Sequence, residues 1–247
     1  MNFLMKQKLI SLCLLPILAF GNWAMDFDED WAAAWGAPDV LDGLVGWWTF
    51  DDSAIDSVGT NNGVWSGTAA YADGKIGKAA RLNGSSYIVL SQDGRANFAV
   101  QEYTVSAWVY SYGGYGFLPV WSYDFTSHTS PYYAQSVAIY ADNRIVYSWN
   151  YSGASGLNYI QTSSSAFATG AWHHVVAVFS TGSQRVYVNG VPVASGSNAD
   201  TVTYYEQPVW VGHSNFATAV PCLLDDVRFY NRALSSNEVS QIFNRYK

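Results

Sequence analysis

The sequence has few charged residues and little of the composition that builds long helices. Charged residues make up 13% of the 247-residue chain, against about 25% in typical soluble domains. Disorder is excluded, because 49% of the residues are hydrophobic and such a chain can bury enough apolar surface to offset its ordering entropy. Coiled coils are excluded too, since Ala, Leu, Glu, Lys and Arg dominate their sequences. The net charge of -7 argues against nucleic acid, whose phosphates are met by Lys and Arg.

Glutamate is scarce, and this scarcity bears on catalysis. The chain holds Glu29, Glu102, Glu206 and Glu238 only. A glycoside hydrolase needs two carboxyl groups about 5 to 9.5 Å apart, and the Glu-x-Asp-x-x-Glu run in which some glucanases carry them is missing. The sequence also lacks a Gly-x-Ser-x-Gly motif and a phosphate-binding loop. It therefore favours a protein that is not an enzyme, with polysaccharide cleavage as a lesser alternative.

No apolar run approaches the length of about 20 residues that spans a bilayer, so we expect no membrane span. The run at residues 9–20 follows two lysines, and the small residues Ala19 and Gly21 suit signal peptidase. We therefore expect a signal peptide at residues 1–21 and export to a secreted, periplasmic or cell-surface location. A lipoprotein alternative would modify Cys13, but Leu12 stands where such a site needs a small residue.

Cysteine is nearly absent as well. Removal of residues 1–21 leaves Cys222 alone, and an exported chain with one cysteine has no internal disulfide. We expect Cys222 to be a small buried apolar residue, the alternative being a thiol that cross-links to another chain.

Two regions follow the signal peptide. Residues 22–42 are acidic, contain tryptophan and alanine and show no strand pattern, which is typical of a lead-in or linker. From residue 43 onward, short runs of Val, Ile, Tyr, Trp and Thr alternate with Gly, Asn, Asp and Ser, the signature of an all-β sandwich or barrel. Residues 104–110 and 174–179 have apolar residues at successive positions, which predicts strands buried on both faces.

Two local signals predict the end of the chain in more detail. Asn189 and Gly190 suit the two positive φ angles of a type I′ turn, and Pro192 marks the strand after it as an edge. Ser235 and Glu238 form a capping box at the start of a short C-terminal helix, whose apolar face would carry Val239, Ile242 and Phe243.

Seven short motifs follow one another from about residue 43 to the end. They are Trp47-Trp48-Thr49-Phe50-Asp51 with Asp56-Ser57, Gly74-Lys75-Ile76-Gly77-Lys78-Ala79, Leu82-Asn83-Gly84 before Tyr87-Ile88-Val89, Thr104-Val105-Ser106-Ala107-Trp108, Gly170-Ala171-Trp172-His173-His174, Val186-Tyr187-Val188-Asn189-Gly190, and Asp225-Asp226-Val227-Arg228 through Leu234 with Glu238. In this order they resemble the laminin-G-like, concanavalin-A-like lectin/glucanase jelly-roll domains. The resemblance implies an all-β, two-sheet antiparallel jelly-roll sandwich over residues 43–247. It leaves function open, because this fold serves lectins, adhesion modules, hydrolases and lyases.

The resemblance also implies a structural calcium ion that joins the N-terminal segment to the last strand. Calcium takes six to eight oxygen ligands from carboxylates and carbonyls. The family pattern places them on Asp51 or Asp56, on a carbonyl of the Asn83–Gly84 turn, and on Asp225. The alternative is that these residues only form turns. Zinc is not expected, because His128 and His213 have no ligand at zinc spacing and His173 and His174 belong to a strand motif.

Aromatic residues are concentrated at residues 103–159, which hold eleven of the eighteen tyrosines. Strand alternation turns about half of each strand's residues inward, so the core cannot bury all of these rings. Exposed Tyr and Trp rings stack on sugars and anchor protein partners. The candidate ligand-binding residues are Trp121, Tyr123, Tyr132, Tyr133, Trp149 and Tyr151. The alternative, which we expect for Trp108 and about half of the others, is that they fill the sandwich.

Two functions fit these observations. The first is a non-catalytic recognition module that binds glycan or an extracellular or cell-surface protein, as an adhesin or lectin does. The second is a structural subunit that assembles into an extracellular or pilus-like complex through the same aromatic surface.

Overall fold

The computed structural model describes residues 39–113, 116–124, 132–151, 156–217 and 219–247. The predicted signal peptide and most of the predicted lead-in lie outside these residues. A compact unit spans residues 37–247. Val40 within it is buried, so the folded unit begins ahead of the predicted boundary at residue 43. None of the helices in the described ranges is long and apolar enough to cross a membrane.

The described chain consists mainly of strands, as its short β-branched and aromatic runs predict. In chain order the strands are β1 (Leu44–Trp48), β2 (Val64–Ser66), β3 (Tyr71–Asp73), β4 (Lys78–Leu82), β5 (Tyr87–Ser91), β6 (Tyr103–Ser111), β7 (Leu118–Tyr123), β8 (Gln135–Ile139), β9 (Ile145–Tyr151), β10 (Gly156–Gln161), β11 (Trp172–Ser180), β12 (Ser183–Val188), β13 (Val191–Gly196), β14 (Val209–Val211) and β15 (Cys222–Tyr230). The described helices are η1 (Gly94–Ala96), a single 3-10 turn, and α2 (Ser236–Tyr246).

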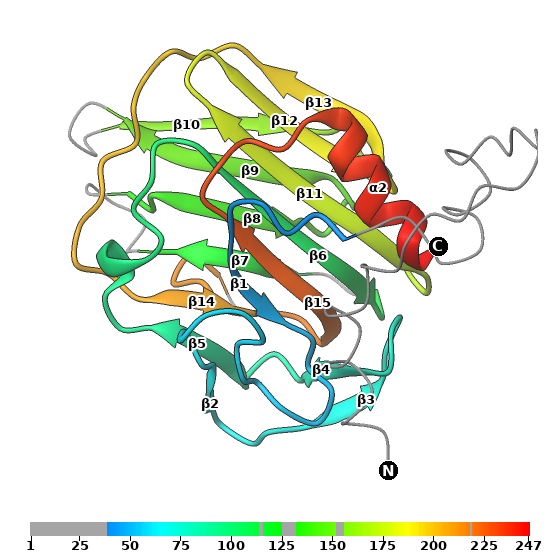
Figure 1. Cartoon of the computed structure of the whole chain (residues 1–247). Coiled ribbons are helices and arrows are strands. Elements are labelled where there is room, and N and C mark those ends of the chain that lie inside the picture. Colours follow the sequence, from blue (N-terminus) through cyan, green and yellow to red (C-terminus); the bar gives the residue numbers. More distant parts are fainter. Residues whose placement is uncertain (1–38, 114–115, 125–131, 152–155, 218) are drawn as a thin grey trace, which may run out of the picture. The chain divides into compact units, whose positions relative to one another are not determined.

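The strands form two antiparallel sheets packed in two layers (Figure 1). The eight-stranded sheet has the order β13-β12-β11-β6-β15-β4-β3, and β1 pairs with the second half of β15. The seven-stranded sheet has the order β10-β9-β8-β7-β14-β5-β2. Strands far apart in the sequence are neighbours, as where β6 lies between β11 and β15. The predicted jelly-roll sandwich is confirmed.

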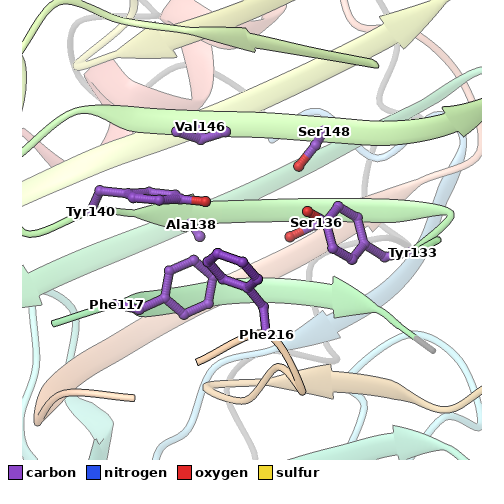
Figure 2. A pocket seen from close by; sticks show the side chains of 8 residues that line it. All are labelled: Phe117, Tyr133, Ser136, Ala138, Tyr140, Val146, Ser148 and Phe216. Atoms are coloured by element: carbon purple, nitrogen blue, oxygen red, sulfur yellow. The ribbon is translucent and has the colours of Figure 1, made fainter. Parts of the chain in front are cut away.

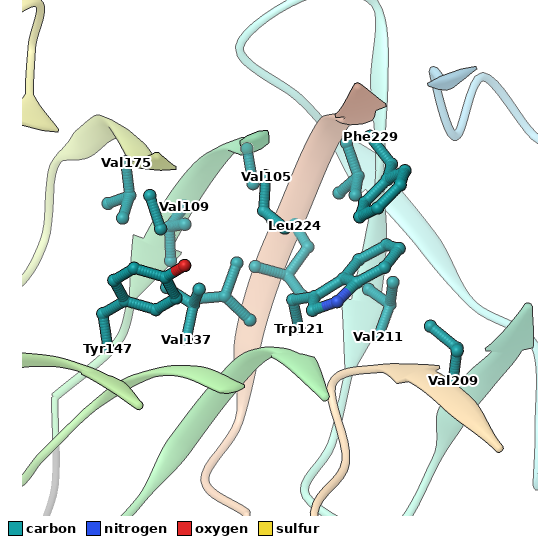
Figure 3. Close-up of a cluster of buried hydrophobic side chains, with 14 of the residues drawn as sticks. Val105, Val109, Trp121, Val137, Tyr147, Val175, Val209, Val211, Leu224 and Phe229 are labelled. Atoms are coloured by element: carbon teal, nitrogen blue, oxygen red, sulfur yellow. The ribbon is translucent and has the colours of Figure 1, made fainter. Parts of the chain in front are cut away.

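The hydrophobic core lies between the two sheets (Figure 3). Val105 and Val109 of β6 and Leu224 of β15 point into it from one sheet, and Val137 of β8 and Tyr147 of β9 point into it from the other. Val105 and Val109 lie four residues apart in β6, as a pleated strand with one core face requires.

Cys222 at the start of β15 is free, belongs to this core and is buried, as expected. Burial raises the pKa of its thiol to about 12, so the thiol stays protonated and packs as a small apolar group.

Helix α2 packs on the outer face of the eight-stranded sheet. Ser235 accepts the Glu238 backbone N–H, and the Glu238 side chain in turn accepts the Ser235 N–H, so the predicted capping box is confirmed. Val239 and Ile242 form a second apolar cluster with Val176 of β11 and other outward-facing residues of that sheet. The helix therefore covers one outer face of the sandwich.

The predicted hairpin joins β12 to β13. Asn189 has a φ of 51° and Gly190 a φ of 78°, the positive values that a type I′ turn requires. Strand β13, which contains Pro192, lies at the end of the strand order, which confirms the predicted edge.

A buried charge network fastens the chain before β1 to β15. The Arg228 side chain has no exposed surface and forms ion pairs with Asp39 at 2.5 Å and with Asp226 at 3.1 Å. Its guanidinium also lies 4.3 Å from the ring centre of Trp47 and 5.8 Å from that of Tyr246 in α2. Residue 39 is thus held to the first strand, the last strand and the helix through one cation.

Candidate functional site

The outer face of the seven-stranded sheet carries a hollow whose floor is made of short side chains. In β8 every second residue belongs to the core, which turns Ser136 and Ala138 to the opposite face. The same alternation in β9 turns Val146 and Ser148 outward. Ser136 pairs with Ser148 and Ala138 with Val146 across the two strands, so the four side chains lie side by side.

Aromatic side chains surround this floor (Figure 2). The space over the floor is lined by Phe117, Tyr133, Tyr140 and Phe216 in addition to the four floor residues, and these side chains fill it so that no room for a water molecule remains. It adjoins a wider hollow of about 280 Å³, which shares several of these residues and is also lined by Arg144, Leu157, Tyr159 and Gln161. We call the two hollows together the aromatic groove.

The rings of the groove support one another. Phe117 lies edge-on to Tyr140 and close to Phe216, with ring centres 5.3 Å apart in each case. The Tyr159 and Phe216 side chains keep 59% and 37% of their surface exposed. The groove therefore offers apolar ring surface to solvent, and part of that surface is held in place by contacts between rings.

The hydroxyls of Tyr133 and Tyr140 stay protonated over the whole physiological range. Burial raises the pKa of Tyr133 well above its ordinary value, and it raises the pKa of Tyr140 despite the opposing effect of the Arg144 charge. Both tyrosines thus carry neutral hydroxyls, which can donate and accept hydrogen bonds.

Three of the predicted ligand-binding residues are wrong, because they lie in the core. Trp121, Tyr123 and Trp149 have at most 1% of their surface exposed. A β-bulge between Pro119 and Trp121 shifts the register of β7, so that Val120 and Trp121 both reach the core. Trp121 stacks on the ring of a phenylalanine in β15 and donates its indole N–H to Gln135. Strict alternation predicts an outward side chain at one of two successive positions, and the bulge removes this alternation.

The other three predicted residues differ in their positions. Tyr133 lines both hollows of the aromatic groove. Tyr132 and Tyr151 are half-buried outside its lining, and the Tyr132 carbonyl accepts a hydrogen bond from the side chain of Asn150. The structure thus brings one of the six predicted residues to the groove.

The remaining groove residues were not singled out from the sequence. The short outward residues of β8 and β9 could have been found, because Ser136, Ala138 and Ser148 alternate with large apolar residues in two neighbouring strands. Tyr140 and Tyr159 lie within the aromatic-rich stretch. The sequence gives no indication that Phe216 belongs to the groove, because Phe216 lies in a loop about 70 residues after β9.

The histidines in the described ranges have structural partners. His174 is buried, and its Nε2 lies 2.8 Å from the hydroxyl of Ser106. His173 packs on Phe167, and His213 stacks on Tyr87 with ring centres 4.1 Å apart. His128 lies outside the described residues.

Two of the predicted calcium ligands meet at the loop between β3 and β4. The Asp225 Oδ2 accepts the Ile76 N–H at 2.9 Å, and the Asp51 Oδ1 accepts the Lys78 N–H at 2.7 Å. The Asp225 Oδ1 is buried and has no hydrogen-bond partner among the described residues. Burial raises the pKa of the Asp225 carboxyl to about 7, and the charges of Asp226 and Asp51 add to the rise. A cation beside the orphaned oxygen would supply the missing partner.

Two glycines leave the space that these two carboxylates occupy. A Cβ on Gly74 would lie 2.6 Å from the Asp225 Oδ2, and one on Gly77, whose φ is +65°, would overlap the Asp51 Oδ1. No group of three or more His, Cys, Asp or Glu side chains placed to hold a metal ion occurs in the described part of the chain. A calcium ion at Asp225 would therefore take most of its ligands from backbone carbonyls or water.

The other predicted metal ligands are engaged elsewhere. Asp56 is buried and accepts the backbone N–H groups of Trp47, Val58 and Asn61. Asn83 accepts two backbone N–H groups in its own turn. Because Ala80 pairs with Leu224 in β15, the Asn83–Gly84 turn lies about four residues, or about 13 Å, along β4 from the Asp225 position. Asp56, Asn83 and Gly84 therefore serve in turns, which is the alternative given in the sequence analysis. The assignment of Asn83 and Gly84 to the Asp225 site is wrong.

The architecture defines the class of protein. Two antiparallel sheets packed as a jelly roll, with a C-terminal helix on one outer face and a groove on the other, make a β-sandwich of the lectin type. The family model described as the concanavalin A-like lectin/glucanases superfamily, of the laminin G type, matches residues 82–240. The chain belongs to this family, and the resemblance found in the sequence is confirmed.

Solved structures of similar fold include several binding domains. Domain 4 of AbnA, a GH43 extracellular arabinanase from Geobacillus stearothermophilus, determined in complex with arabinotriose, is 27% identical, with a TM-score of 0.61 over 81% of this chain and 98% of that one. The binding domain of botulinum neurotoxin DC in complex with SialylT is 13% identical with a TM-score of 0.65, over 84% of this chain. The binding domain of Paraclostridial Mosquitocidal Protein 1 is 20% identical with a TM-score of 0.63, over 83% of this chain.

The extent of these likenesses differs. The present chain spans about half the length of the two toxin binding-domain chains, 52% in each case, and these two show the fold alone. No curated protein matches the sequence.

Proposed function

We propose that the chain is an exported, non-catalytic recognition module that binds glycan in the aromatic groove. The observation that carries the proposal is the groove itself, in which short side chains form a floor beneath exposed aromatic rings. Domain 4 of AbnA, which is 27% identical to this chain, was determined in complex with arabinotriose, and this supports a sugar as the ligand.

The chemistry of the groove suits a sugar. The C–H faces of a sugar ring are apolar and stack on aromatic surface such as that of Tyr159 and Phe216, while its hydroxyls need hydrogen-bond partners. Ser148 and Gln161 supply hydroxyl and amide groups in the lining of the wider hollow, which also contains these two rings. A concave site with apolar walls and a few polar groups is the usual form of a small-ligand site.

The groove favours binding over cleavage. Among the described residues, no aspartate or glutamate lines it, whereas hydrolysis of a glycosidic bond needs a pair of carboxyl groups. Glu206 lies outside the lining and forms an exposed ion pair with Arg95 at 2.9 Å.

The test is a titration of the full chain with glycans, first with arabinan oligosaccharides and then on a glycan array. Tyr159→Ala and Phe216→Ala each remove an exposed groove ring, and we expect binding weaker by about two- to tenfold, because stacking of one aromatic side chain contributes roughly 0.5–1.5 kcal/mol. Tyr112→Ala is the matched control, since Tyr112 is 53% exposed and lies outside the groove lining. Equal loss in all three variants, or a blank array, would contradict the proposal.

The alternative of an assembly subunit gives a different result. A stable oligomer in native mass spectrometry, together with a blank array, would favour assembly. Export is tested by measuring the mass of the protein after expression of the full sequence. Cleavage after residue 21 would give a mature chain whose mass is lower than that of the precursor by the mass of the signal peptide.

We also propose that a calcium ion binds at Asp225 and Asp51, where it would neutralise the two carboxylates and tie β15 to the loop between β3 and β4. The orphaned buried Oδ1 of Asp225 supports this proposal. We expect a chelator to lower the melting temperature and added Ca²⁺ to restore it, and we expect Asp225→Asn to abolish this response. A melting curve that is the same in chelator and in excess Ca²⁺ would overturn it.

A further inference from the structure

The aromatic groove contains one charged side chain, and it is a cation. Arg144 lines the wider hollow, and the other described residues of both linings are uncharged. This is unusual for a chain with nineteen acidic residues and twelve basic ones. The one charged side chain of the lining is therefore opposite in sign to the net charge of the whole chain.

Arg144 is held in place but has unused donors. Its guanidinium lies 5.1 Å from the ring centre of Tyr140, which keeps its plane beside the groove wall. Its Nε lies 3.5 Å from the Asp142 Oδ1, and no hydrogen bond satisfies this N–H. The structure records no partner for its two terminal nitrogens among the described residues. A planar guanidinium with free terminal N–H groups matches a carboxylate in a two-point contact.

Resting on the proposed function, we infer that the ligand of the aromatic groove is an acidic glycan, and that Arg144 binds the carboxylate of a uronic acid unit. The Tyr159 ring, which is exposed in the same lining, stacks on the sugar ring to which this carboxylate is attached. Asp142 holds the guanidinium and at the same time weakens its attraction for the ligand, because its carboxylate competes for the same charge.

The experiment compares each acidic oligosaccharide with its own neutral form. Oligomers of galacturonate, glucuronate and mannuronate are titrated into the full chain beside their carboxyl-reduced counterparts, which keep the linkage and ring stereochemistry and lose only the charge. We expect at least one uronate to bind about tenfold more tightly than its reduced form, the gain from one charge-assisted contact at a partly exposed site. The difference should shrink with added salt.

Two variants with opposite expected effects on uronate binding test whether this charge preference arises in the groove. Arg144→Gln should abolish the preference for the acid, so that the acidic and the carboxyl-reduced oligosaccharide bind this variant with equal affinity. Asp142→Asn keeps the side-chain oxygen that accepts the Arg144 backbone N–H and removes the competing charge, so we expect uronate binding about two- to fivefold tighter.

The failures of the two proposals are distinguishable. If none of the three uronates binds more tightly than its reduced form, or if Arg144→Gln weakens both forms equally, the inference is overturned. In that case, if the reduced oligosaccharides bind the wild-type chain and no longer bind the Tyr159→Ala variant, the proposed glycan-binding function is still supported. If no oligosaccharide of either kind binds and the groove variants change nothing on the array, both proposals fail.

Discussion

Removal of the buried cation Arg228 should destabilise the fold strongly. In the Arg228→Met variant the side chain keeps much of its volume, but Asp226, 3% exposed, and Asp39, 10% exposed, lose their partner. Breaking a buried ion pair by removal of one partner costs about 3–5 kcal/mol, because the remaining charge is left without compensation. The contacts of Arg228 with the rings of Trp47 and Tyr246 are lost as well.

The expected shift in melting temperature follows from the size of the domain. For domains of 150–250 residues, 1 kcal/mol corresponds to about 2–4 °C, so a loss of about 4 kcal/mol predicts a melting temperature lower by roughly 8–16 °C. Calorimetry and urea unfolding at neutral pH measure this loss. The double variant Arg228→Met with Asp226→Asn should recover part of it, since the stranded charge is then absent.

Two results would refute this reasoning. A loss below about 1 kcal/mol for Arg228→Met would show that the network behaves like an exposed ion pair. A double variant as unstable as the sum of its two single variants would show that Arg228 and Asp226 do not interact in the folded chain. The wild-type stability should change little between low and high salt, because buried pairs are poorly screened.

Three further predictions concern the core, the helix cap and pH. Trp121→Ala should lower stability by about 3–5 kcal/mol because it opens a cavity between the sheets, and chemical denaturation would show this loss. Ser235→Ala removes the side-chain acceptor of the capping box and should cost about 1 kcal/mol by the same measurement. Burial lowers the pKa of His174 to about 3, and the Arg228 charge adds to the effect, so between pH 6.5 and 3 the unfolded chain binds the proton that the folded chain excludes. Stability should therefore fall by up to about 1.4 kcal/mol per pH unit as the pH drops below 6.5, and His174→Gln should remove this contribution, which an undiminished pH slope in the variant would contradict.

The parts of the fold that local signals define could be predicted from the sequence. The turn at Asn189 and Gly190 and the helix cap at Ser235 each depend on a few neighbouring residues, and both are confirmed. The strands predicted at residues 104–110 and 174–179 are confirmed as β6 and β11. Both are buried on both faces, because the core covers one face and α2 or neighbouring rings cover much of the other. The sandwich itself followed from the order of the family motifs.

The candidate site was harder to predict, because it depends on register and on distant segments. The bulge in β7 turned Trp121 inward; Pro119 suits a strand edge or a bulge, but it does not tell which of the following side chains turns inward. One wall of the groove is formed by Phe216, whose loop lies far along the sequence from β7 and β8 and contacts Phe117 next to β7. Tyrosine counts indicated the stretch of chain that supplies most of the groove lining, but they could not separate the rings that fill the core from those that line the groove.

The core and the groove take separate residues from the same strands. In β9, Tyr147 and Trp149 point into the core, whereas Val146 and Ser148 point into the groove. Since successive side chains of a strand alternate between its two faces, ligand preference can change at Ser148 with little cost in stability, while a change one residue further along opens a cavity. If the proposed function holds, a groove of this construction would accommodate different glycans on one unchanged sandwich. The fold alone therefore does not identify the ligand, and the charge at Arg144 has to be tested directly.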